Sequence, residues 1–251
     1  MFIDIVPCQP LGAALSCRLK QMRIAIENVC YEVSGTAILH DINYGSDAKR
    51  IGIIGRNGSG KSTLSRLLCG IENPTQGKIF IDGIDVVKDR KSALRTVGIL
   101  FQNPDQQLIF PTVLEELCFG LTQLGLSKSN AIDKAHKKLA EFKKEHWYDK
   151  PVQSLSQGQK KLLCLMAILV MEPEVILLDE PLAALDIPTQ RQLFDVFDRI
   201  EQTLVYVTHD LSPIEDYDEI IWLEKGRIVE CGKPRTLLPK FRAEMDRIEV
   251  L

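Results

Sequence analysis

The stretch Gly55-Arg56-Asn57-Gly58-Ser59-Gly60-Lys61-Ser62-Thr63 decides the fold and the chemistry of this 251-residue chain. It matches the pattern G-x-x-x-x-G-K-[ST], in which glycines let successive backbone N–H groups turn toward the phosphates of a nucleotide. The pattern places Lys61 on the β and γ phosphates and the Ser62 hydroxyl on magnesium. We therefore predict a site that binds ATP with Mg2+ and hydrolyses the nucleotide.

The residues on either side of this loop provide the strand and the helix that the motif requires. Arg50–Gly55 reads Arg-Ile-Gly-Ile-Ile-Gly, a short apolar strand that ends where the loop begins. Leu64–Leu68 predicts the helix that follows, whose N-terminus points its positive end at the phosphates. A glycine-rich turn that arose by chance would lack this context, so we favour the nucleotide site.

Further apolar segments alternate with helical ones along the chain. Strand patterns occur at Arg23–Glu27, Lys78–Ile81, Thr96–Phe101, Val175–Leu178, Thr203–Val207 and Glu219–Leu223. This alternation predicts the α/β class, a P-loop NTPase with a mostly parallel sheet core. The turn at 224–227 leads into an antiparallel edge strand. From about Pro104 to Leu162 helices replace strands, which predicts a helical subdomain at about residues 103–165 inserted into the core.

Composition excludes several other classes of protein. Hydrophobic residues make up 45% and charged residues 26%, and the net charge of -3 does not favour nucleic acid as a partner. The seven cysteines form no CxxC pair, which argues against a disulfide framework or a zinc site and for a reducing compartment. The apolar run Leu162–Met171 is too short to span a bilayer. Residues 1–21 precede a second methionine and the first strand, so we expect a disordered or non-native extension.

Val175-Ile176-Leu177-Leu178-Asp179-Glu180 carries the second half of the predicted chemistry. Asp179, at the end of a buried strand, is placed to hold magnesium through water. Glu180 is placed to orient or deprotonate the attacking water. Adjacent carboxylates also occur at ordinary strand ends, but the phosphate loop upstream favours the catalytic interpretation.

Leu155-Ser156-Gln157-Gly158-Gln159 lies shortly before that strand. Ser156 predicts a helix N-cap, and Gly158 allows the close approach of an anion. With this order of motifs, residues 22–251 resemble the ATP-binding cassette (ABC) family, whose signature is usually Leu-Ser-Gly-Gly-Gln. The resemblance implies an ABC nucleotide-binding domain with a RecA-like core, in which the signature contacts ATP held by a second subunit.

The resemblance also implies roles for four other residues. Gln102 matches the family glutamine that contacts magnesium and senses the membrane partner, so it joins Ser62 and Asp179 as an expected metal ligand. His209 matches the histidine that contacts the γ-phosphate. Leu185 and Asp186 match the D-loop, which crosses to the other subunit.

Two positions depart from the family pattern. Gln157 replaces the usual second glycine of the signature. The aromatic residue that usually stacks on adenine would fall at Val33, with Tyr31 two residues earlier on the same strand face. If Tyr31 does not reach the base, a stacking contact of roughly 1–3 kcal/mol is lost.

A subgroup of the family is indicated by Phe101-Gln102-Asn103-Pro104-Asp105-Gln106-Gln107, with Thr112–Glu116 and Phe119-Gly120 downstream. These residues are similar to the ATPases of energy-coupling-factor (ECF) importers, which take up vitamins and transition-metal ions. The signature and the strand 97–101 are most similar to the ATPase subunits of biotin transporters. Leu108–Phe110 could form a groove for a partner's amphipathic helix, or could simply pack at the domain junction.

The resemblance implies a subunit at the cytoplasmic face of the membrane that drives import by closing as a dimer around ATP. The implied partners are a second ATPase subunit, an integral membrane coupling subunit and a substrate-binding membrane subunit, with no nucleic acid. Three alternatives remain open: the ATPase of a conventional amino-acid or metal importer, a cassette protein acting on DNA or ribosomes, and a small-molecule kinase. The hypothesis of a small-molecule kinase does not account for the signature or for His209.

Overall fold

The computed structural model describes residues 22–247, which divide into two compact units. Of the described residues, the first unit combines 22–97 with 203–247, and the second is Gly98–Gln202. The helical subdomain expected at about residues 103–165 falls within the second unit. The extension expected at residues 1–21 lies outside the described residues.

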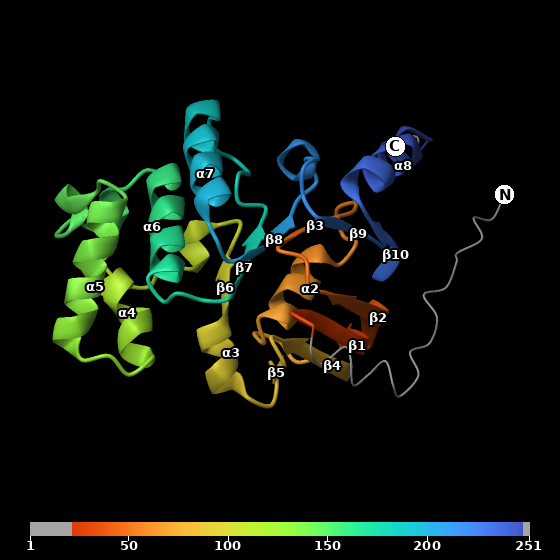
Figure 1. The fold of residues 1–251 in the computed structure, drawn as a ribbon, viewed down its shortest axis with the longest axis horizontal. Coiled ribbons are helices and arrows are strands. Elements are labelled where there is room, and N and C mark those ends of the chain that lie inside the picture. Colours follow the sequence, from red (N-terminus) through yellow and green to blue (C-terminus); the bar gives the residue numbers. More distant parts are fainter. Residues whose placement is uncertain (1–21, 248–251) are drawn as a thin grey trace. The chain divides into compact units, whose positions relative to one another are not determined.

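The first unit contains an antiparallel sheet of four strands (Figure 1). Its order is β2-β1-β4-β5, with β1 at Ile24–Val33, β2 at Thr36–Ser46, β4 at Gln76–Ile81 and β5 at Ile84–Asp85. The sequence reading missed β2. Its buried residues Leu39 and Ile42 are three positions apart, and the left-handed Asp41 (φ 50°) between them breaks the two-residue alternation.

Strands β3 (Arg50–Ile54), β8 (Thr203–Val207), β9 (Glu219–Glu224) and β10 (Arg227–Gly232) form the mixed sheet of the first unit, in the order β10-β9-β3-β8. β3 runs parallel to β8 and β9, and β10 pairs antiparallel with β9. Every residue of β8 is buried, as is typical of a parallel strand covered on both faces. The predicted α/β class, with parallel core strands and an antiparallel edge, is confirmed.

Within residues 22–247, the first unit has three α-helices: α2 (Lys61–Leu68), α3 (Arg90–Thr96) and α8 (Pro234–Arg247). The prediction that Thr96 begins a strand is wrong, because Thr96 is the last residue of α3. Asp89 caps this helix by accepting a hydrogen bond from the Ser92 backbone N–H, and the Thr96 hydroxyl donates to the Ser92 carbonyl at 2.9 Å. Strand β6 (Val97–Leu100) therefore starts one residue later.

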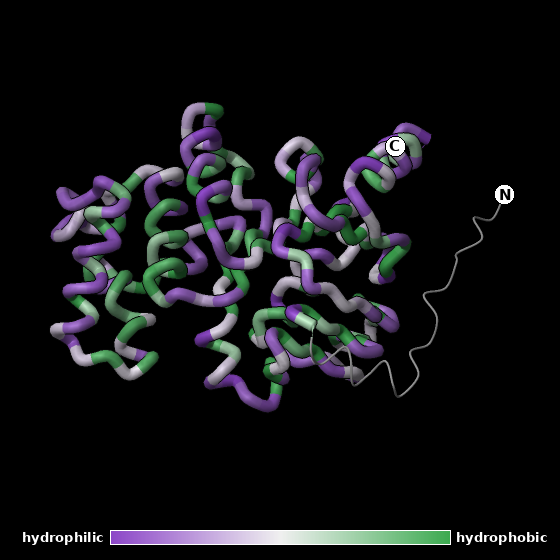
Figure 2. Tube along the Cα trace, in the orientation of Figure 1, coloured by the Kyte–Doolittle hydropathy of each residue, from purple (hydrophilic) through white to green (hydrophobic). Residues whose placement is uncertain are grey.

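The second unit pairs β6 with β7 (Val175–Asp179) and holds four α-helices. These are α4 (Val113–Gln123), α5 (Lys128–Glu141), α6 (Gln157–Leu169) and α7 (Ile187–Arg199). Figure 1 shows α4 and α5 beside α6. In Figure 2, α6 changes from hydrophilic at its start to hydrophobic along its body, which packs into a core with Val113, Leu117, Leu139 and Trp147.

Helix α5 ends at Glu141, although lysines continue to Lys144. Lys143 adopts a left-handed conformation (φ 55°) beyond that end. The Lys144 N–H then bonds the Leu139 carbonyl at 2.7 Å, which closes the helix end. No helix within residues 22–247 is long and apolar enough to cross a membrane.

The core of the second unit yields a prediction about stability. Leu139 is fully buried among the residues of this core. We expect Leu139→Ala to lower the free energy of unfolding by about 2–5 kcal/mol, because it removes buried methyl groups and leaves a cavity. Chemical denaturation followed by far-UV circular dichroism measures the loss. Ile187→Ala, at a residue 65% exposed, is the control and should change it by less than about 0.5 kcal/mol; equal losses would contradict the assignment of the core.

Candidate functional site

The phosphate loop joins the end of β3 to the start of α2. Three of its glycines have a positive φ: Gly55 (155°), Gly58 (78°) and Gly60 (100°). A Cβ on Gly55 would lie 2.0 Å from the Leu223 carbonyl oxygen, and one on Gly60 would lie 2.7 Å from a Leu39 methyl group. Side chains are therefore excluded from the wall of the loop, which leaves backbone groups to line it.

Lys61 holds the loop in place from within. Its side chain is buried, and its amine donates to the carbonyl oxygens of Gly55 at 2.8 Å and Arg56 at 3.0 Å. Ser59 is also buried, and its hydroxyl has no hydrogen-bond partner among the described residues. A buried unpaired hydroxyl beside a backbone cradle fits an anionic ligand that supplies the missing acceptor.

The loop is anchored to the neighbouring strand β9. Arg56 donates from Nε and Nη2 to one carboxylate oxygen of Glu224, at 2.9 and 2.6 Å. This hydrogen bond and the Glu224 charge raise the pKa of the Arg56 guanidinium, which is charged at any working pH in either case. The Gly226 N–H donates to the Ser59 carbonyl at 3.0 Å and fixes the other side of the loop.

His209 follows β8, the strand that pairs in parallel with β3. Ile53 lies opposite Val207 in that pairing, and the Thr208 N–H donates to the Ile53 carbonyl at 3.1 Å. The carboxyl ends of neighbouring parallel strands meet at one edge of a sheet, so His209 and the phosphate loop share that edge. His209 is exposed there.

Tyr31 and Val33, the two positions considered for adenine, lie on β1. The Tyr31 hydroxyl donates to the Glu72 carboxylate, and this bond raises the pKa of the phenol. Val33 is 46% exposed at the end of the strand. Tyr31 is thus held by its hydroxyl end, while Val33 presents only a small apolar surface.

In the second unit, Gln102 and Glu180 are in contact. Strand β7 is buried along its whole length and carries Asp179, also buried, as its last residue. Glu180 follows in a left-handed conformation (φ 45°), which turns the chain sharply at the strand end. The Gln102 side-chain amide donates to a Glu180 carboxylate oxygen at 3.0 Å. Two residues that are 78 positions apart in sequence therefore meet, as expected for parts of one site.

The signature forms the start of α6. Leu155 is buried, and Ser156 caps the helix by accepting from the Gln159 N–H, while the Gln159 side chain accepts from the Ser156 N–H at 3.1 Å. This reciprocal capping box fixes the first turn of the helix. The predicted N-cap at Ser156 is confirmed.

Gln157, the residue that departs from the usual signature, has a partner of its own. Its amide donates to Asp105 at 3.1 Å, and the amine of Lys160 donates to the other oxygen of the same carboxylate at 2.7 Å. The bonds from Lys160 and Gln157 lower the pKa of Asp105. The side chain that replaces glycine therefore links the signature to the Asn103-Pro104-Asp105 loop.

Gly158 is required by packing within the second unit. A Cβ at this position would lie 2.3 Å from the side-chain methyl of Thr189 in α7. Thr189 also donates its N–H to Asp186, the N-cap of α7, at 2.9 Å. Asp186, expected to reach another subunit, thus also caps its own helix, and this bonding lowers its pKa.

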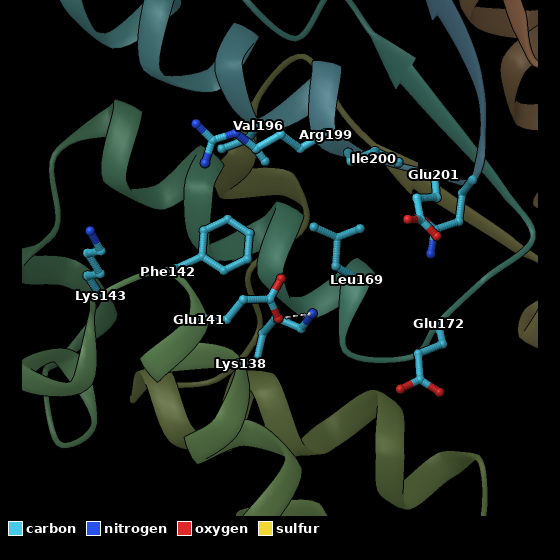
Figure 3. Close-up of a pocket in the computed structure, with 11 residues that line it drawn as sticks. Lys138, Glu141, Phe142, Lys143, Leu169, Glu172, Val196, Arg199, Ile200 and Glu201 are labelled. Carbon is cyan, nitrogen blue, oxygen red and sulfur yellow. Dashed lines mark hydrogen bonds and ion pairs between the residues drawn. The ribbon is translucent and has the colours of Figure 1, made fainter.

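Three cavities open in the second unit. One of about 340 Å3 is lined by Gln102 and Gln157 together with the D-loop, and one of about 320 Å3 lies beside Ser156 and Gly158. The third, of about 590 Å3, is shown in Figure 3 and lies among the ends of α5 and α7 and the residues after α6. An ion pair of Lys138 with Glu141 flanks it at 2.7 Å. None of the predicted site residues lines this third cavity.

Comparison with known proteins identifies the class to which this fold and these motifs belong. Residues 39–183 match the ABC transporter family. The chain belongs to that family, as a subunit that binds and hydrolyses ATP. The resemblance inferred from the order of the motifs is confirmed.

Two relatives indicate which subgroup of the ABC transporter family the chain is similar to. The chain is 46% identical over 225 residues to a biotin transport ATP-binding protein, BioM, from Rhodobacter capsulatus, covering 90% of this chain and 96% of the relative. It is 38% identical over 210 residues to an energy-coupling factor transporter ATP-binding protein from Methanocaldococcus jannaschii, covering 80% and 75%. The similarity to ECF ATPases and to biotin-transporter subunits is confirmed.

Two solved structures share the fold. A subunit of the ABC transporter complex cbiONQ from Clostridium perfringens superposes with a TM-score of 0.75 at 30% identity, over 90% of this chain and 94% of that one. A dimeric ATP-binding cassette in a post-hydrolysis state with ADP and Pi superposes with a TM-score of 0.73 at 25% identity, over 84% and 99%.

Several contacts around the motifs were not foreseen from the sequence. Glu224 was read only as part of a hairpin turn, yet it holds Arg56. Lys161 directly precedes the apolar run Leu162–Met171 and is 1% exposed. Its place next to that run was the available signal, because lysine is seldom fully buried without a partner.

The close approach of Gly158 to Thr189 predicts that Gly158 is needed for packing against α7, independently of any role in anion binding. Gly158→Ala should lower the free energy of unfolding by about 1–3 kcal/mol, because the stiff Thr189 side chain cannot easily yield to the new methyl group. Adding Thr189→Ser removes the clashing methyl and keeps the hydroxyl, so it should restore most of the loss. Thermal melting of both variants measures the effect, with Thr189→Ser alone as the control; no recovery in the double variant would contradict the packing role.

Proposed function

We propose that this chain energises an ECF-type importer of biotin through ATP-driven closure of a dimer. The observation that carries the proposal is the 46% identity to a biotin transport ATP-binding protein over 96% of its length. Another vitamin or a transition-metal ion is the alternative cargo within the same class. A conventional amino-acid or metal importer is less well supported by these relatives.

The phosphates of ATP fit the loop Gly55–Thr63. Any Cβ at Gly55 or Gly60 would clash with Leu223 or Leu39, so the loop keeps a backbone wall, and the buried Ser59 hydroxyl needs an acceptor. The Lys61 amine lies at this loop and donates hydrogen bonds to its carbonyl oxygens. We assign the amine to the β and γ phosphates, where its charge offsets theirs. Arg56, Asn57, Gly58 and Thr63 complete the backbone of the cradle.

Three side chains provide oxygen donors suited to Mg2+: Ser62, Gln102 and Asp179. Hydroxyl, amide and carboxylate oxygens are the ligands that magnesium prefers. Bound magnesium would neutralise charge that develops on the transferred phosphoryl group.

Glu180 is proposed as the group that orients and deprotonates the attacking water. The Gln102 amide donates to its carboxylate at 3.0 Å, which fixes the carboxylate relative to β6 and its following loop. A proton taken from water would rest on the Glu180 carboxylate. His209, exposed at the carboxyl end of β8, is proposed to contact the γ-phosphate.

A second copy of the chain would complete each nucleotide site. We assign Ser156–Gln159 to the nucleotide held by the partner copy, and Leu185-Asp186 to the partner's surface. Tyr31 and Val33 remain the candidates for the adenine, with a weak contact expected because the Tyr31 hydroxyl is tied to Glu72.

The loop after Gln102 is the proposed contact with an integral membrane coupling subunit. Ile109 is 70% exposed, and the rings of Phe110 and Phe119 lie 5.0 Å apart at the edge of the same segment. Exposed apolar side chains beside a polar loop suit an amphipathic helix of the partner. A substrate-binding membrane subunit would complete the importer, with this chain attached at the cytoplasmic face of the membrane.

Glu180→Gln tests the catalytic assignment. The amide keeps the shape of the side chain but cannot accept the proton, so ATP turnover should fall roughly 100-fold or more. The variant should bind ATP and elute from gel filtration as a trapped dimer. Glu174→Gln, at an exposed residue before β7, is the matched control and should behave as wild type. ATP turnover by Glu180→Gln at the wild-type rate would contradict the proposed role of Glu180.

The cargo is tested by uptake in cells that lack their own biotin transporter. The chain is co-expressed with the membrane coupling subunit and the substrate-binding subunit of a biotin importer, and accumulation of labelled biotin is measured. We expect ATP-dependent accumulation that is lost with Lys61→Ala. Accumulation of labelled cobalt or nickel instead of biotin, with the same dependence on Lys61, would keep the class and overturn the biotin assignment.

A further inference from the structure

The loop from Glu180 to Asp186 is held in a conformation that its own residues do not favour. Glu180 (φ 45°) and Ala184 (φ 60°) both lie in the left-handed region, which is costly for residues that carry a Cβ. One backbone hydrogen bond within the loop, from the Ala183 N–H to the Glu180 carbonyl at 3.1 Å, helps to close the turn. Such a conformation persists when neighbouring groups fix it.

Lys161 of α6 holds the loop from one side. The residue is 1% exposed, and its amine lies 3.2 Å from the Ala183 carbonyl oxygen and 3.5 Å from that of Glu180. Burial lowers the pKa of the Lys161 amine to about 8. A buried amine needs acceptors, and these two carbonyl groups provide them.

Gln190 of α7 holds the loop from the other side. Its side-chain amide donates to the Leu182 carbonyl at 3.3 Å and to the Leu185 carbonyl at 3.0 Å. Two side chains from two helices therefore occupy four carbonyl groups between the predicted catalytic carboxylate and the D-loop. We call Lys161 and Gln190 the carbonyl clamp.

Lys161 moves with the signature because both belong to the same helix. Ser156 caps α6, and Lys161 lies five residues further on, about 7.5 Å along the helix axis. The capping box fixes the first turn of α6, so a displacement of Ser156 by a bound phosphate is transmitted to the Lys161 amine. The loop between Glu180 and Leu185 would follow that amine.

We propose that Lys161 and Gln190 are positioning residues that couple the signature to Glu180 and Leu185-Asp186 of the same chain. This inference rests on the proposed function, in which the signature contacts the partner's nucleotide while Glu180 acts on its own chain's nucleotide. The clamp then links the two nucleotide sites of the dimer through one chain. Such coupling is reciprocal, so each site influences ATP binding at the other.

The test compares Lys161→Met with Lys161→Arg in full-length protein. Met fills a similar volume without a donor, and Arg restores donors in the same place. We expect Lys161→Met to bind ATP and form ATP-dependent dimers as wild type does. Its kcat should fall about 10- to 100-fold, because small displacements of a catalytic group carry costs of this size. The Hill coefficient for ATP should fall toward one, and Lys161→Arg should recover part of both losses.

Gln190→Met keeps the inference testable if Lys161→Met does not fold, and it should show the same change in kcat and Hill coefficient. Lys137→Met, at an exposed lysine of α5, is the matched control and should behave as wild type. Unchanged kcat and Hill coefficient in the clamp variants would overturn the inference. A loss of kcat that tracks a loss of melting temperature or of ATP-dependent dimerisation would also overturn it, in favour of a purely structural role.

Failure of the clamp and failure of the proposed function give different results. If wild-type protein does not hydrolyse ATP, or Glu180→Gln does not trap a dimer, the proposed function fails. If both hold and the clamp variants keep wild-type kinetics, only the inference about Lys161 and Gln190 fails.

Discussion

The hydrogen bonds from the Lys61 amine to the carbonyl oxygens of Gly55 and Arg56 are the contacts on which the proposed nucleotide site depends. They hold a loop whose wall consists of backbone, because Gly55 and Gly60 leave no room for a Cβ. A lysine amine offers three donors and a full charge, so it can fix carbonyl groups and still attract phosphates. Arg56 ties the same loop to Glu224 at the end of β9.

The second unit uses the same chemistry at the start of α6. Lys161, like Lys61, is a buried lysine that donates to backbone carbonyl groups of a loop. Around it, Gln157 and Lys160 bond Asp105, and Gly158 packs against Thr189. The first two turns of α6 therefore contact the loop after Gln102, the loop after Glu180 and helix α7. Through these contacts a phosphate bound at the signature could displace both Glu180, the proposed catalytic carboxylate, and the proposed membrane contact.

Sequence reasoning predicted the parts of the fold whose patterns are local. The phosphate loop, the apolar strands β3, β7 and β8, and the capped start of α6 follow from glycine spacing, apolar runs and capping residues. Strand β2 was missed because the left-handed Asp41 interrupts its alternation. Helix α3 was not predicted, because its Asp89 cap lies in a charge-rich stretch with no apolar periodicity.

The contacts that tie the site together could not be predicted in the same way. Gln102 meets Glu180, and Gln157 meets Asp105, across 78 and 52 positions of sequence, so only the folded chain brings them together. Gln157 departs from the usual signature, and nothing in the sequence accounts for a glutamine there. In the structure its amide donates to the Asp105 carboxylate. Gly158 was read as space for an anion, and it also makes room for α7. Long-range polar pairs leave no periodic pattern, which is why they escape a reading of one sequence.

The central claim is that each nucleotide site needs the phosphate loop of one chain and the signature of another. Mixing two inactive variants tests it most directly: Lys61→Ala, which loses its own phosphate loop, and Ser156→Arg, which blocks the signature. Each variant alone should lack ATPase activity. An equal mixture should recover up to about a quarter of the wild-type rate, because about half of the dimers are mixed and each of these holds one intact site of two. A mixture that stays as inactive as its components would contradict the claim.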